Sequence, residues 1–170
     1  ILSDRKHFGP LVVQRPFYPE GDGCCHVYLL HPPGGVVPGD DLSIHVRVGD
    51  QAHALVTTPA AGKLYRSHGP IQRVFNELTV QQSGYLEWLP QETIIFDGAD
   101  GRLVTRVNLD PEARFAGWEI VCLGRPASKA LFERGMCRQH FELWRDGMPL
   151  SLERSSFRGG EPILHARWGL

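Results

Sequence analysis

Apolar and polar residues alternate along most of this 170-residue chain in short, regularly spaced runs. The run LSIHVRV at residues 42–48 places an aliphatic residue at every second position, with polar residues such as His45 between them. This period of two is typical of a half-buried β-strand, and it predicts that His45 faces solvent. The runs that predict strands span residues 9–15, 25–31, 42–48, 53–58, 72–80, 85–89, 93–96, 102–109, 114–123, 135–144 and 148–157.

Clusters of proline, glycine and aspartate separate these runs. The motif PPGG cannot continue a strand, because proline donates no ladder hydrogen bond and glycine favours the positive φ angles of tight turns. The motif GDD predicts a second turn, which places the carboxylates of Asp40 and Asp41 beside exposed backbone. We therefore expect residues 31–67 to form two hairpins, with the strands at 42–48 and 53–58 paired.

One segment has the composition of a helix. The sequence PASKALFE at 126–133 has a proline in its first turn, and Gly135 follows just past its end, a pattern that predicts a short helix. The remaining pattern predicts a mainly β fold. Regular short strands without interleaved helices fit a β-sandwich or a β-solenoid in which successive strands stack, and periodicity alone does not choose between them.

Composition and charge exclude several classes of partner. The chain has 18 Lys and Arg against 19 Asp and Glu, a net charge of −1, so no general field attracts nucleic acid or an anionic membrane. The longest apolar runs fall far short of the ~20 residues that span a bilayer, which predicts a soluble protein of one domain. Four cysteines without a CxxC motif, and no signal pattern, predict free thiols in a reducing cytoplasm.

The motifs of the commonest enzyme classes are missing. AAGKLYRS contains Gly-Lys but lacks the upstream glycine and the following Ser or Thr of a P-loop, and GxSxG, HExxH, GxGxxG and a Cys/His zinc pattern are absent. Cys25 and His31 share one face of a predicted strand but lie about 20 Å apart at roughly 3.3 Å per residue, so they cannot ligate one ion. We predict no catalytic residue and interpret the cysteines as packing residues.

Three groups of polar residues are candidates for binding. The loop with Lys63, Arg66 and Ser67 either binds an anion or a partner carboxylate, or is an exposed basic loop. Asp40 and Asp41 either cap their turns or do chemical work. The third group consists of acids inside apolar strands, which either point outward or line an internal polar passage. They are Glu87, Glu119 and Glu153.

Four long motifs resemble those of one protein family. HPPGGVVPGD, TTPAAGKLYRSHG, LEWLPQETIIFDGA and WEIVCLGRP follow the order found in the UreD family, also called UreH, of urease accessory proteins, and the resemblance runs from Gly9 to Glu153. It implies a solenoid-like β superhelix with one or two short helices. It also implies a cytosolic, non-enzymatic scaffold that binds apo-urease, joins UreF and the GTPase UreG, and takes part in delivering Ni²⁺ to urease.

The resemblance extends to single residues. Asp40, Ser67, Glu119 and Glu153 match family positions. We therefore take Asp40, Glu119 and Glu153 as candidates for a nickel path and His31 as a weaker one, so Ni²⁺ is expected to bind transiently and no cofactor tightly. Residues of the partner or loop surface are Asp41, Lys63, Tyr65, Arg66 and Ser67. Family members carry an acid after LGRP that this chain lacks, and they begin earlier and end later. We therefore expect residues 1–170 to be a single UreD-like β domain, incomplete at both ends.

Two other functions fit the sequence. One is a β-sandwich module that binds a small anion or a carbohydrate at residues 63–67. The other is a metal-dependent hydrolase that uses Asp40 and Asp41. Urease structural genes beside the gene for this chain would favour the scaffold, and assays with generic hydrolase substrates test the hydrolase.

Overall fold

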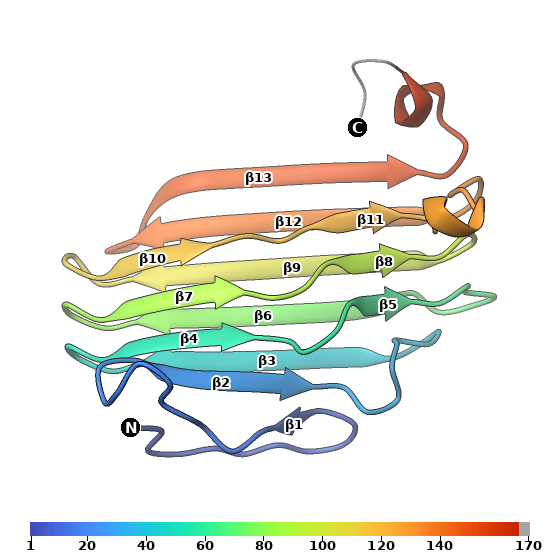
Figure 1. The fold of residues 1–170 in the computed structure, drawn as a ribbon. Helices are drawn as coiled ribbons and strands as arrows, with labels where there is room; N and C mark the ends of the chain where they lie inside the picture. Colours follow the sequence, from blue (N-terminus) through green and yellow to red (C-terminus); the bar gives the residue numbers. More distant parts are fainter. Residues whose placement is uncertain (167–170) are drawn as a thin grey trace.

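A computed structural model describes residues 1–166, which wind into a β-solenoid of about three turns (Figure 1). Each full turn of the solenoid contains a strand in one sheet, then a short strand after a corner, and then a long strand that returns in the opposite sheet. The strands are β1 (Val12–Val13), β2 (Cys25–Leu30), β3 (Asp41–Val48), β4 (His53–Thr57), β5 (Gly62–Leu64), β6 (Gln72–Val80), β7 (Tyr85–Leu89), β8 (Thr93–Ile95), β9 (Asp100–Leu109), β10 (Arg114–Gly117), β11 (Val121–Leu123), β12 (Met136–Arg145) and β13 (Met148–Arg158). Two short 3-10 helices are η1 (Pro126–Ser128) and η2 (Pro162–His165).

Neighbouring strands of each sheet come from successive turns of the solenoid. Strands β2, β4, β7 and β10 are parallel in one sheet, β5, β8 and β11 in a second, and β3, β6, β9 and β12 in a third. β1 and β13 pair antiparallel at sheet edges. The register stacks like residues: Leu42 lies opposite Val74, and Val74 lies opposite Leu103. Inward-facing aliphatic side chains therefore form ladders across the turns.

The apolar core lies between the facing sheets. Leu78, Leu86 and Val107 are fully buried in one cluster, and a second cluster forms around Leu64 and Ile95. The alternation that predicts strand 42–48 matches the burial along β3, where the aliphatic positions face inward and the polar positions between them are exposed.

The predicted hairpins at residues 31–67 are wrong. β3 pairs with β6, whereas β4 pairs with β2 and β7, so the strands joined by the turn at 49–52 lie in opposite sheets. The turn reverses the chain as in a hairpin, but the apolar faces then meet across the core, where Val48 and Val56 share one cluster. This arrangement buries both faces against each other, which side-by-side pairing would not do. Parallel pairing between successive turns also excludes the β-sandwich alternative.

The predicted helix at 126–133 is wrong beyond its first turn. η1 ends at Ser128, and the next residue, Lys129, adopts a left-handed φ of 56°. Further along, the backbone N–H groups of Glu133 and Arg134 donate to the Asp97 carboxylate at 3.1 and 2.9 Å. These contacts with a distant residue hold the segment in an irregular conformation, so they override its local helix propensity.

Two predicted strands also have different limits. The run at 9–15 contains only the two-residue strand β1, and the run at 114–123 is divided into β10 and β11. Residues 118–120 form the corner between these two strands, which brings Glu119 to the edge of the interior. The solenoid-like, mainly β fold is confirmed, with half of the residues in strands and only short 3-10 helices. Among residues 1–166, no helix has the length and apolar character needed to cross a membrane.

Candidate functional site

Two cavities meet at one carboxylate. The larger, about 360 Å³, is lined by residues of all three sheets, and the smaller, about 160 Å³, lies beside β12 and β13. The larger has a mainly aliphatic lining with a few polar groups, which include His31, Asn76, Glu119 and Gln139. The smaller is lined by Glu119 and Gln139 together with Trp118, Phe141, Glu153 and Ser155. Glu119 and Gln139 therefore stand at the boundary of both.

The Glu119 carboxylate accepts hydrogen bonds from three neighbouring strands. Thr105 Oγ1 donates to Glu119 Oε1, and Asn76 Nδ2 donates to the same oxygen at 3.3 Å. Gln139 Nε2 donates to Glu119 Oε2 at 3.4 Å. β6, β9 and β12 thus supply one donor each. All three contacts stabilise the ionised form of the carboxylate.

Burial acts on Glu119 in the opposite direction. Loss of water raises the pKa of Glu119 above its ordinary value, and the hydrogen bonds from Thr105, Gln139 and Asn76 offset this only in part. A cation that arrives beside the carboxylate favours the ionised form and so displaces the proton. The hydrogen-bond network around Glu119 is therefore suited to bind a cation.

The register of the long sheet places Glu153 on the same face as this network. Asn76 lies opposite Thr105, Thr105 lies opposite Phe141, and Phe141 lies opposite Glu153. Directly paired residues share one face of a sheet, so Glu153 extends the inward face of β12 onto β13. Glu153 itself is exposed. Water can therefore reach the carboxylate of Glu153 where it lines the smaller cavity.

His31 contributes an imidazole to the larger cavity. Its Nε2 is buried and has no hydrogen-bond partner in the described part of the chain. Burial lowers the pKa of His31, and the charge of Asp40 opposes this effect. The Asp40 carboxylate also accepts a hydrogen bond from the Val37 backbone N–H at 2.9 Å, so it caps its turn. A mainly neutral imidazole leaves one ring nitrogen able to ligate a cation.

Comparison with known proteins identifies the family of this chain. The family model described as "UreD urease accessory protein" matches residues 1–170. The chain belongs to the UreD family. A curated UreD relative, "Urease accessory protein UreD" of Saccharophagus degradans, is 53% identical over 171 residues, which cover 99% of this chain and 58% of the relative. The protein of the same name from Citrobacter koseri is 47% identical over 167 residues, 98% of this chain and 58% of the relative.

Another UreD relative, from Pseudoalteromonas translucida, is 53% identical over 171 residues, which cover 99% of this chain and 57% of that protein. This UreD chain thus spans somewhat more than half the length of the curated relatives that it matches. Such identity over nearly all of the chain confirms the family resemblance of its four motifs.

The loop at 63–67 of this UreD chain makes its polar contacts within the protein. Lys63 Nζ donates to two backbone carbonyl oxygens at 3.3 and 3.4 Å, and Arg66 donates to the Asp97 carboxylate at 3.2 Å. Ser67 Oγ donates to a nearby backbone carbonyl at 3.1 Å, and Tyr65 packs edge-on against an aromatic neighbour. These contacts within the protein give no support to a small-anion or carbohydrate site at the loop.

The two carboxylates of the GDD turn have different surroundings. Asp40 caps the turn, whereas Asp41, the first residue of β3, is exposed. Neither belongs to a group of three or more metal-ligating side chains in residues 1–166. The hydrolase alternative therefore finds no support in their geometry.

Sequence reasoning identified Glu119 but missed the three donors around it, which are Asn76, Thr105 and Gln139. Each is a polar residue at an inward position of an apolar strand, a signal that the alternation contains. The other two acids have different surroundings. Glu153 is exposed and lines the smaller cavity. Glu87 is half-buried like Glu119, but its carboxylate lies 2.7 Å from His53 Nε2 and borders neither cavity.

Proposed function

We propose that this chain takes part in urease maturation as a non-enzymatic scaffold that passes Ni²⁺ to apo-urease along the two cavities that meet at Glu119. The shared lining carries this proposal, because a cation at Glu119 and Gln139 borders both cavities. Glu153 on the smaller cavity and His31 on the larger one offer further ligand atoms along the same route.

The ligand set suits delivery of Ni²⁺ better than storage. A tight site for this ion uses several converging imidazole or thiolate ligands. Glu119, Glu153 and a single imidazole from His31 instead offer separate, weaker contacts. Conduction requires binding that is strong enough for an ion to enter and weak enough for it to leave. Weak contacts at successive positions meet both requirements.

The proposed partners are apo-urease and UreF, with UreG reached through their complex. The relatives' name supports a urease partner, and an exposed apolar row on the edge strand β13 supports a protein contact, since such rows mark binding surfaces. The row consists of Met148, Leu150 and Leu152. Four free thiols support a cytoplasmic location, and the near-zero net charge supports no nucleic-acid or membrane partner.

Glu153→Gln tests the passage at a side chain that the fold does not need. The variant keeps the shape of an exposed residue but removes its charge, so we expect urease activation to fall roughly tenfold. Activity is measured in cells that co-express urease genes and the full protein. Calorimetry of the purified wild type should show weak Ni²⁺ binding. Glu112→Gln, the same change at an exposed glutamate outside both cavities, should activate normally.

Two results would contradict the passage. One is normal activation by Glu153→Gln at equal soluble protein and limiting Ni²⁺. The other is nanomolar Ni²⁺ binding that His31→Ala alone abolishes, because that pattern indicates a dedicated site rather than a path.

Asp40→Ala is expected to impair activation more than stability. The variant loses a turn cap at the Val37 N–H, which costs about 1 kcal/mol. It also removes the negative charge that acts on His31. Denaturant unfolding and urease activation per soluble protein are the measurements, with Asp41→Ala as the neighbouring control. A sharp fall in Tm, with activation following the soluble level, would make Asp40 structural.

A further inference from the structure

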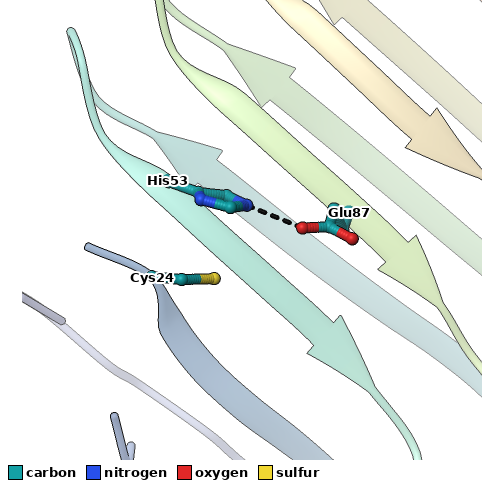
Figure 2. A group of neighbouring side chains, drawn as sticks. All are labelled: Cys24, His53 and Glu87. Atoms are coloured by element: carbon teal, nitrogen blue, oxygen red, sulfur yellow. Dashed lines mark hydrogen bonds and ion pairs between the residues drawn. The ribbon is translucent and has the colours of Figure 1, made fainter. Parts of the chain in front are cut away.

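Cys24, His53 and Glu87 converge on the outside of the solenoid (Figure 2). One ligand atom of each residue lies within 4.8 Å of the others. Within residues 1–166, this is the one such group of three or more Cys, His, Asp or Glu side chains. None of the three lines either cavity, so the cluster is separate from the proposed nickel passage.

The parallel register of β2, β4 and β7 assembles this cluster, because Cys24 directly precedes β2, His53 begins β4 and Glu87 lies within β7. Cys24 and His53 directly precede Cys25 and Ala54, which pair between β2 and β4 and pack into the core. Because successive residues of a strand face opposite ways, Cys24 and His53 face outward. Glu87 lies on β7, two positions along from the residue paired with His53, and so shares its face. Packing alone, the role that the sequence predicts for all four cysteines, does not explain these neighbours of Cys24.

The surroundings of the cluster are unusual for an outer face. Cys24 is only 4% exposed, and burial together with the charges of Glu20 and Glu87 raises the pKa of its thiol. His53 Nε2 lies 2.7 Å from Glu87 Oε1, and its ring stacks on Tyr85 with 4.6 Å between centroids. A surface His–Glu pair accounts for two of these residues. It does not account for a covered thiol whose Sγ lies within 4.8 Å of a ligand atom of both residues, whereas a cation among the three groups does.

We propose that Cys24, His53 and Glu87 bind one divalent transition-metal ion of the Zn²⁺ class. A thiolate, an imidazole and a carboxylate are the ligands that this ion takes in proteins, and three protein ligands leave a fourth tetrahedral position for water. On binding, the Cys24 S–H bond breaks, its proton passes to solvent, and Sγ donates an electron pair to the ion. The ion replaces the hydrogen bond between His53 and Glu87. The strand ladders do not depend on this ion, so the site is exchangeable.

The test uses the full protein, freed of metal, with Zn²⁺ and Co²⁺ as probes. Competition with a chromophoric chelator should show one Zn²⁺ site. Cys24→Ser should weaken the Zn²⁺ affinity of this site by at least roughly tenfold to a hundredfold, because losing even a residue that only hydrogen-bonds a metal ligand has an effect of this size. Co²⁺ should give a thiolate charge-transfer absorption that is lost in Cys24→Ser. Cys122→Ser, the same change at a thiol outside the cluster, should keep both signals. His53→Gln and Glu87→Gln should also weaken Zn²⁺ binding, although both variants retain the Cys24 thiol.

The proposal fails if the wild type shows no stoichiometric Zn²⁺ site, or if Cys24→Ser binds as the wild type does. Circular dichroism checks that each variant is folded. Should Cys24→Ser not fold, unchanged Zn²⁺ affinity in both His53→Gln and Glu87→Gln overturns the site equally well. Glu153→Gln should keep the Co²⁺ absorption whatever its effect on urease activation. Failure of the nickel passage and failure of this site are therefore distinguishable.

Discussion

Gly135→Ala is expected to lower the free energy of unfolding by about 3 kcal/mol or more. A Cβ atom at this position would lie 2.2 Å from the Ala99 backbone oxygen, and Gly135 has a φ of +103° that other residues rarely adopt. The clash is with backbone, so no side-chain rotation relieves it. The same place carries hydrogen bonds from Met136 N–H to Ala99 and from Gly159 N–H to Gly135. Moving the backbone would therefore disturb the starts of β9 and β12 and the end of β13 together.

Gly69→Ala is the matched control for this loss of stability. A Cβ atom at Gly69 would meet nothing within 4 Å, and its φ is not in the left-handed region. We expect its free energy of unfolding to lie within a few tenths of a kcal/mol of the wild-type value. Denaturant unfolding of the full protein compares the two variants. Equal stability of Gly135→Ala and Gly69→Ala would mean that the backbone around residues 99 and 135 can move enough to admit the added methyl group.

Strands were predictable because their signal is local. The period of two at 72–80 and 85–89 gives the same limits as β6 and β7, and burial alternates along β9 as the pattern requires. Strand partners were not predictable, because the turn after Val48 has the same chemistry in a hairpin as in a solenoid corner. Only the burial of two apolar faces against each other selects the solenoid, and that is a property of the whole chain.

For the site as well, the local sequence pattern identifies single residues but not the distant residues that they contact. An acid inside an apolar strand is visible in the sequence, and Glu119 was found in this way. Its donors Asn76 and Thr105 are 43 and 14 residues away. They meet Glu119 only through the register of β6 and β9 and the corner between β10 and β11. The metal-ligating cluster was missed for this reason as well, since His53 and Glu87 are 34 residues apart.

Glu119→Gln is expected to reduce urease activation more than any other change proposed for the passage, by roughly tenfold to a hundredfold. The variant keeps the size of the side chain and removes the charge at the boundary of both cavities. Activation is measured per soluble protein in cells that co-express the urease genes. Glu112→Gln again serves as control. The expected loss follows from the proposed function, so it needs a second measurement that separates function from folding.

The pH dependence of unfolding supplies that measurement. Burial raises the folded-state pKa of Glu119 above its ordinary value of 4.5, so the native state holds this proton more tightly than the unfolded state. The contribution of this proton to stability is complete below pH 4.5 and is lost as pH rises through the folded-state pKa. The amide that replaces the carboxylate cannot ionise, so the stability of Glu119→Gln relative to the wild type should increase over this rise in pH. A carboxyl group whose ionisation costs stability, and whose replacement by an amide reduces activation, is a residue retained for function. A fall in stability that accounts for the lost activation would instead make Glu119 a structural residue.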